Sequence, residues 1–161
     1  MKSLPWNLVF SLIAVIAFIP AGRVLAGAAD LPAGTAKGTF TPEGKPAVTL
    51  VFATTFLDVK DSDKPVILIL SDKKLGSEKW TSEFDMMEEH PIFNGVAFWL
   101  DKDGNVFRMA TFVDGEHASV SGYFDLKLEG VFGKNLAGAV VTNAQASGGP
   151  KADATFHVVL K

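Results

Sequence analysis

Three histidines and the carboxylates near them are the side chains in this sequence best suited to metal-assisted chemistry. His90 directly follows Glu88 and Glu89, and His117 and His157 lie further along the chain. If the fold brought the three imidazoles together, they could hold a zinc ion that activates water for hydrolysis. No two histidines stand four residues apart, as in a helical zinc pair. A metal-assisted hydrolase is therefore one hypothesis among several.

Two of these histidines also have simple structural interpretations. An imidazole near the C-terminus of a helix can satisfy terminal carbonyls, which would explain His90. His157 stands between Phe156 and Val158 in an alternating run, which predicts an imidazole on the solvent side of a strand. The sequence therefore points to no cofactor, and the histidines are weak candidates for metal ligands.

The series Asp101, Asp103 and Asn105 resembles the opening of a calcium-binding loop. Such a loop needs glycine at its sixth position and glutamate at its twelfth, where this chain has Val106 and Phe112. An Asp-Gly pair between two alternating apolar runs is instead typical of a tight β-hairpin turn. We therefore predict a hairpin here.

Familiar catalytic machinery is missing from the sequence. The chain has no cysteine, which excludes thiol catalysis and thiolate metal sites. None of the serines after the leader stands in a glycine-flanked elbow, and there is no phosphate-binding glycine loop. We predict no catalytic residue, and we expect a binding or interaction function more than an enzyme.

The start of the chain has the layout of a secretory signal peptide. Lys2 precedes an apolar run over residues 8–19, followed by Pro20 and small residues. The run is too short for a membrane-spanning helix, which takes about 20 residues. We predict cleavage after Ala26, or alternatively after Ala28. Because position 28 is not cysteine, the sequence excludes a lipid anchor. The signal peptide predicts an exported protein, either periplasmic or extracellular.

Cleavage would leave a flexible Gly, Ala and Pro rich leader at 27–36 and one domain at 37–161. Without Lys2 and Arg23 the basic count falls from 15 to 13 against 18 acidic residues. The resulting acidic chain has no cluster of positive charge, so we expect no nucleic acid as a partner.

Alternating apolar and polar residues predict about eight strands in this domain. The strand-like runs are 38–41, 46–56, 65–70, 96–101, 106–112, 118–124, 126–132, 136–142 and 153–161. Gly130 and Gly138 inside such runs indicate bulges, tight curvature or close backbone approach. We predict a mainly β fold, either a small antiparallel barrel or a strongly curled sheet or sandwich.

One helix is predicted over residues 82–90, with Ser82 as its N-cap and Asp85 at the capping-box position. Trp80, Phe84 and Met87 would form an apolar stripe that packs across the sheet. The run at 65–70 is apolar on both faces, so this helix is expected to cover its second face.

The high phenylalanine content, 13 residues against one tyrosine, is mostly explained by core packing. In a wide barrel the same side chains could line an apolar ligand pocket. Our candidates for this pocket are Phe98, Leu100, Phe107, Met109, Phe112 and Phe124.

The turns and strand ends of the chain resemble an uncharacterised family of small secreted bacterial β-rich proteins. The resemblance lies in residues 70–72, 84–87, 101–105, 138–142 and 153–156. That family has no assigned activity, so it supplies no functional residues. Three hypotheses follow: an exported non-catalytic binding or interaction module, a carrier of a small apolar ligand, or the metal-assisted hydrolase. An open sheet would also offer edge strands for a homodimer.

Overall fold

Nine β-strands dominate the computed structural model, which describes residues 27–131 and 134–160. The strands are β1 Thr35–Thr41, β2 Val48–Leu57, β3 Val66–Ser71, β4 Gly95–Leu100, β5 Val106–Val113, β6 Glu116–Val120, β7 Phe124–Val131, β8 Asn135–Thr142 and β9 Lys151–Val159. A 3-10 turn, η2 Ser77–Lys79, and one short helix, α1 Glu83–Glu88, lie between β3 and β4.

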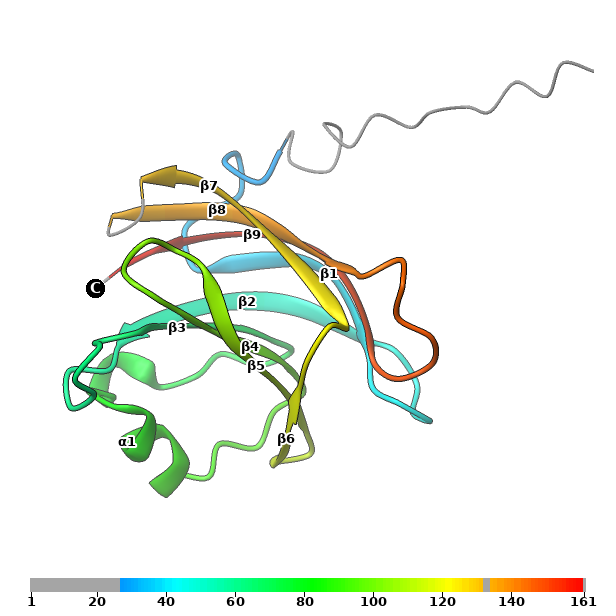
Figure 1. The fold of residues 1–161 in the computed structure, drawn as a ribbon, viewed down its shortest axis with the longest axis horizontal. Coiled ribbons are helices and arrows are strands. Elements are labelled where there is room, and N and C mark those ends of the chain that lie inside the picture. The colour runs from blue at the N-terminus through cyan, green and yellow to red at the C-terminus, as the bar shows by residue number, and fades with distance from the viewer. Residues whose placement is uncertain (1–26, 132–133, 161) are drawn as a thin grey trace, which may run out of the picture.

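The strands form a single antiparallel sheet in the order β6-β5-β4-β3-β2-β1-β9-β8-β7. The sheet curls strongly into a half-barrel (Figure 1). β6 and β7 follow each other in the chain but lie at opposite edges, and no pairing joins them in the described residues. The predicted mainly β fold with one short helix is confirmed, as a curled open sheet with nine strands.

The inner face of the curl holds the larger hydrophobic core. Alternate side chains of β3 and β4, among them Leu68 and Phe98, are fully buried on this face together with residues from both ends of the sheet. Phe98 contacts Phe124 of β7 edge to face, with ring centroids 6.4 Å apart. This contact joins strands that are six places apart in the sheet order. The curl therefore brings the edge strand β7 into contact with β4 across the inner core.

A second core covers the outer face of β2 to β5. It consists of the other alternate side chains, such as Ile67 and Trp99, packed against Trp80, Met86 and Phe93 from the segment between β3 and β4. Figure 1 shows α1 lying against this outer side of the sheet. The expectation that the helix would cover the second face of the 65–70 strand is confirmed.

The helix begins as predicted but presents a different face to the sheet. The Ser82 hydroxyl accepts a hydrogen bond from the backbone N–H of Asp85 at 3.1 Å, which confirms the N-cap. The predicted stripe is wrong for Phe84, which is 63% exposed, because Met86 takes the buried position. The Lys60 ammonium lies 5.9 Å from the Phe84 ring on the solvent side.

Two strand predictions need correction. The run at 118–124 is not one strand, because Gly122 has a φ of +72° and separates β6 from β7. β2 does not keep one apolar face, since Leu50 belongs to the inner core and Phe56 to the outer one. The register between β1 and β2 shifts near this point, so an irregularity exchanges the two faces.

Gly138 allows the close backbone approach that its place in a strand predicts. A Cβ at this position would lie 2.3 Å from the carbonyl oxygen of Lys127 and 2.9 Å from the Phe156 ring. Any side chain would therefore push β7 away from β8 and displace a buried ring.

The segment before β1 is attached to the last strand. β1 begins at Thr35, two residues before the predicted domain boundary, and the backbone N–H of Gly34 donates to the carbonyl of His157 at 2.8 Å. The predicted signal peptide lies outside the described residues. Among the residues that are described, no helix is long and apolar enough to cross a membrane.

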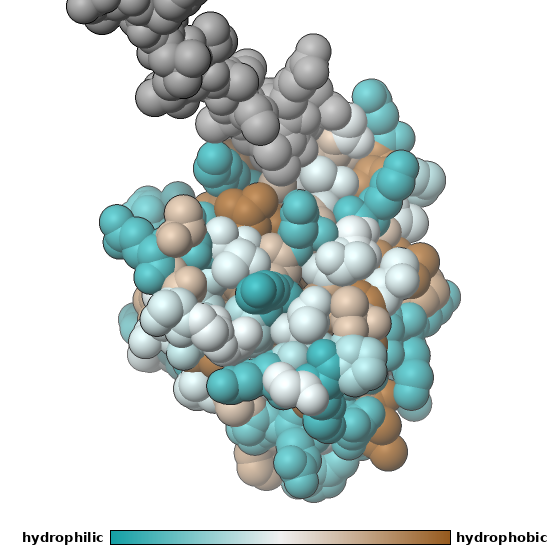
Figure 2. Space-filling view, turned by 90° about the vertical axis from the view of Figure 1, so that its right-hand side faces the viewer, coloured by the Kyte–Doolittle hydropathy of each residue, from teal (hydrophilic) through white to brown (hydrophobic). Residues whose placement is uncertain are grey.

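The surface has no single apolar face in the view of Figure 2. Hydrophilic and near-neutral residues cover most of this side, and hydrophobic residues appear as separate spots. Isolated apolar residues of this kind are normal on a protein surface.

Candidate functional site

The candidate site is a pocket between the C-terminal end of α1 and the β5–β6 hairpin. Its volume is about 300 Å³. The lining residues are Glu83, Met87, His90, Pro91, Phe112, Gly115 and His117. Two of the three predicted histidines therefore meet here, together with a carboxylate and an apolar floor.

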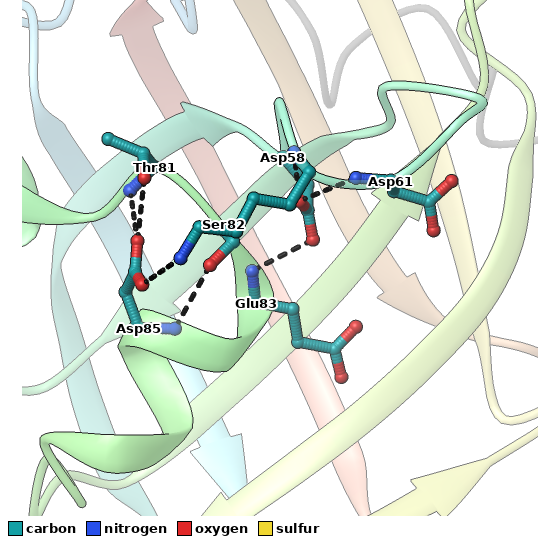
Figure 3. Close-up of polar contacts among 7 residues, drawn as sticks. Asp58, Asp61, Thr81, Ser82, Glu83 and Asp85 are labelled. Carbon is teal, nitrogen blue, oxygen red and sulfur yellow. Dashed lines mark hydrogen bonds and ion pairs between the residues drawn. The ribbon is translucent and has the colours of Figure 1, made fainter.

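Asp58, in the loop after β2, fixes the first turn of the helix (Figure 3). Its buried carboxylate accepts the backbone N–H of Glu83 at 2.8 Å and those of Lys60 and Asp61 at 3.1 Å. These bonds satisfy a donor that the helix start leaves without an intrahelical partner. In Figure 3 the Glu83 carboxylate points away from Asp58.

Asp85 adds a second attachment, although it does not complete the predicted capping box. Its carboxylate accepts the backbone N–H and the hydroxyl of Thr81 at 2.9 and 2.7 Å, in place of the N–H of Ser82. The Lys60 ammonium lies 2.7 Å from the other carboxylate oxygen. The hydrogen bond from Lys60, followed by those from Thr81, holds the pKa of Asp85 well below its usual range.

The Glu83 side chain connects the helix to the sheet. Its carboxylate accepts the indole N–H of Trp99 at 3.0 Å and pairs with the Arg108 guanidinium at 2.8 Å. Arg108 also lies over the Trp99 ring, 4.2 Å from its centroid. Because Trp99 is buried, this hydrogen bond gives the only polar hydrogen of its side chain a partner. The ion pair with Arg108 balances the negative charge of Glu83 at the edge of the pocket.

A series of stacked rings leads from the outer core to the pocket. Phe93 and Phe112 stack with centroids 4.6 Å apart and planes 22° apart. Phe112 and His117 follow at 5.8 Å and 29°. The imidazole of His117 is thus held beside an aromatic surface, while its residue on β6 is exposed.

His90 occupies the residue position just past the helix end in an unusual backbone conformation. Its φ is +43°, in the left-handed region that residues other than glycine rarely adopt. Its N–H donates to the carbonyl of Met87 at 3.2 Å, so the backbone, and not the imidazole, satisfies that helical carbonyl. This conformation places the side chain at the pocket wall.

The turn between β5 and β6 closes the other side. Asp114 and Gly115 both have positive φ, as a tight Asp-Gly turn requires. The side-chain carbonyl of Asn94 accepts the N–H of Asp114 at 3.1 Å, and Asp72 in turn binds Asn94. These contacts fix the turn against the segment that follows α1.

The third histidine lies elsewhere, on the face of β9 that alternates with the buried Phe156 and Val158, as predicted, but the segment before β1 contacts it there. His157 is half-buried on β9, and its Nδ1 is 2.6 Å from the carbonyl oxygen of Leu31. Since a carbonyl only accepts, Nδ1 carries the proton. Among the described residues, no three His, Asp or Glu side chains are grouped so that they could hold a metal ion. The described residues therefore provide no complete set of metal ligands for the proposed hydrolase.

The six residues proposed for an apolar pocket do not form one wall. Phe98, Leu100 and Phe124 belong to the inner core, and Met109 packs against it. Phe112 lies on the outer face, where it lines the candidate site. Phe107 is 58% exposed, because the β4–β5 register skips it between Arg108 and Val106. Strict alternation could not reveal this bulge.

The Asp101 series forms a turn, in agreement with the hairpin prediction. One carboxylate oxygen of Asp101 accepts the backbone N–H groups of Asp103 and Asn105 at 2.9 and 2.8 Å. The hydrogen bonds from Asn105 are the main cause of a lowered Asp101 pKa. Both carboxylate oxygens of Asp101 thus accept hydrogen bonds within the turn.

A larger cleft of about 380 Å³ lies between η2 and the ends of β2 and β9. Its walls include Phe52, Leu75 and Val158, with Lys74 and Glu78 among the lining residues. It contains no imidazole and none of the sequence-predicted site residues. The smaller pocket therefore has the richer chemistry.

Sequence reasoning missed Glu83, Met87 and Arg108 as parts of the site. Period-two alternation along β5 could have placed Arg108 and Phe112 on one face. No sequence signal places that face beside the helix, since the pairing of Glu83 with Arg108 spans 25 residues.

Comparison with protein-family models, with curated proteins and with solved structures finds no match to this chain. The resemblance to a family of small secreted proteins therefore stays a prediction from the sequence.

Proposed function

We propose that this chain is an exported, non-catalytic binding module whose ligand site is the pocket between α1 and the β5–β6 hairpin. The observation that supports it is the meeting of His90, His117 and Glu83 around the apolar surface of Met87 and Phe112. Pockets that bind ligands combine such a floor with a few converging polar groups.

The ligand class follows from the shape and chemistry of the pocket. A volume of about 300 Å³ is at the lower end for small-molecule sites, so it suits a single aromatic ring or one side chain of a partner protein. Met87 and Phe112 offer a thioether and a ring face to such a group. The imidazoles offer hydrogen bonds at its edge, because each has one donor and one acceptor when neutral.

The carboxylate has a positioning role in this proposal. Glu83 already binds Trp99 and Arg108, so its charge is balanced and its position is fixed by the sheet. It keeps the wall of the pocket rigid, which lowers the entropy lost when a ligand binds. This binding function requires no catalytic nucleophile and no general acid.

Binding is tested with small ring compounds and NMR. Indole, phenol and benzoate are titrated into ¹⁵N-labelled protein with ¹³C-labelled methionine methyl groups, and cyclohexanol serves as the aliphatic probe. We expect the ring compounds to shift the Met87 methyl and His117 ring signals, with cyclohexanol at least several-fold weaker. Shifts confined to other regions, or none, would contradict the proposal.

Two variants separate the pocket from the rest of the helix surface. His117→Ala removes a lining side chain on an exposed strand and should reduce binding of indole. Phe84→Ala removes an exposed ring on the same helix that does not line the pocket, so indole binding should stay unchanged. Equal losses in both variants would sink the assignment of the site.

Export is tested separately by expression of the full chain in a bacterial host. The basic start, the apolar run and the small residues before Gly27 support it. We expect intact mass spectrometry of the periplasmic fraction to show a chain beginning at Gly27 or Ala29. Only full-length protein in the cytoplasm would contradict this part of the proposal.

A further inference from the structure

β7 lies at an edge of the sheet with one side unpaired. It pairs with β8 along its whole length, and no strand pairs with its other side in the described part of the chain. Such an edge exposes backbone N–H and C=O groups that another strand can bind. The opposite edge, β6, has five residues against eight in β7. Figure 1 shows β7 as the outermost strand at the top of the sheet.

The exposed side chains of β7 alternate in charge. Asp125, Lys127 and Glu129 are exposed, and Leu126 and Leu128 between them are half-buried toward the inner core. Asp125 accepts a hydrogen bond from the Asn143 amide at 2.9 Å. Lys127 and Glu129 have no hydrogen bond or ion pair with any described residue. A basic and an acidic side chain, two positions apart on β7, are therefore available to pair with charges on a second strand.

We propose that two copies of this chain associate by antiparallel pairing of β7 with β7, with the two-fold axis at Leu128. In this register Lys127 of each copy lies directly opposite Glu129 of the other. The interface is self-complementary, as a two-fold contact must be. Two opposite-charge pairs form on the outer face, and the two Leu128 side chains meet on the inner face.

The neighbouring registers are less favourable. An axis at Lys127 would place two lysines opposite each other and Asp125 opposite Glu129, so every outer pair would repel. An axis at Leu126 would pair Asp125 with Lys127 but would compete with the bond from Asn143. It would also bring the second copy nearer to the start of β7, where only residues 121–123 separate it from β6.

A cysteine scan reads the register directly, because the chain has no cysteine of its own. Residues opposite each other on an antiparallel pair have Cα atoms about 4.5 to 5.5 Å apart, within the reach of a disulfide. After mild oxidation, Leu128→Cys should give a covalent dimer on a non-reducing gel. Leu126→Cys and Lys127→Cys should give little. Stronger cross-linking of Leu126→Cys or Lys127→Cys than of Leu128→Cys overturns the proposal. So does the absence of any difference among the three variants.

Charge exchange provides an independent measurement that leaves the core intact. Sedimentation is followed from about 5 to about 500 μM, where a small interface is expected to associate. Lys127→Glu and Glu129→Lys should each weaken self-association about 10-fold or more, since both outer pairs become repulsive. Mixing the two variants should restore a dimer, and the double exchange should behave as the wild type.

Asp125→Asn is the matched control, and it should leave association unchanged. A wild-type chain that stays monomeric at about 500 μM, or two variants that fail to associate when mixed, overturns the proposal. Unfolding midpoints close to the wild-type value confirm that each variant is folded. The pocket takes no part in this interface, so ring-compound binding and dimerisation can fail independently.

Discussion

The indole N–H of Trp99 donates a hydrogen bond of 3.0 Å to the carboxylate of Glu83. This bond joins a buried residue of β4 to the first residue of α1. Arg108 completes the contact from β5. The helix is six residues long, too short to be stable alone, so its position depends on such attachments.

Removing the acceptor should therefore destabilise the protein. Glu83→Ala leaves the buried indole N–H of Trp99 and the Arg108 guanidinium without their partner, at a cost of about 1 to 3 kcal/mol. Urea unfolding measures the free energy. Glu88→Ala, an exposed glutamate at the end of the same helix, should change it by less than about 0.5 kcal/mol. Equal effects would mean that the contact with Trp99 is not stabilising.

The buried carboxylate of Asp58 should be more important still. Asp58→Ala removes the acceptor of three backbone N–H groups, and we expect a loss of about 3 kcal/mol in the free energy of unfolding. Asp63→Ala, an exposed residue of the same loop, is the matched control. Hydrogen exchange should also show faster exchange at the N–H of Glu83. A protected N–H in the variant would contradict the role assigned to Asp58.

The low pKa of Asp85 predicts a particular dependence of stability on pH. Its carboxylate is charged in the folded state at pH values where the unfolded chain, with an ordinary pKa of about 3.9, already takes up a proton. Its contribution is thus present above about pH 4 and is lost as the pH falls further. Asp85→Asn should reduce stability at pH 7 and converge with the wild type in acid. Unfolding midpoints from pH 7 to about pH 2 measure this convergence.

The same measurement on Asp63→Asn provides the comparison. The Asp63 carboxylate accepts no hydrogen bond among the described contacts, so this variant should follow the wild-type curve. An Asp85→Asn curve that coincides with that of the wild type at every pH would show that the contacts with Lys60 and Thr81 contribute nothing, and a curve offset by a constant amount would contradict their dependence on the charge of Asp85.

His157 should hold the segment before β1 against the sheet. His157→Phe keeps a ring on β9 but removes the donor to the Leu31 carbonyl. We expect limited proteolysis to cut residues 27–34 several-fold faster, with little change in the midpoint of unfolding. Thr155→Ala, another half-buried residue of β9, should not change the cutting rate. An unchanged rate in His157→Phe would mean that the backbone bond of Gly34 is sufficient.

The sequence by itself determined the local features of this protein. Period-two alternation predicted an antiparallel sheet, Ser82 predicted the helix start, and the Asp-Gly pair predicted the hairpin after Asp101. Each of these depends on residues within a few positions of one another, because capping, turn geometry and strand pleating are short-range effects.

Only the tertiary structure decided which of these features meet. His90 and His117 line one pocket while His157 does not, and β6 and β7 lie at opposite edges although three residues connect them. These outcomes depend on how the sheet curls and on register shifts such as the one that exposes Phe107. Curling sums small twists over nine strands, and a single extra residue changes which face a side chain occupies, so neither can be read from local alternation.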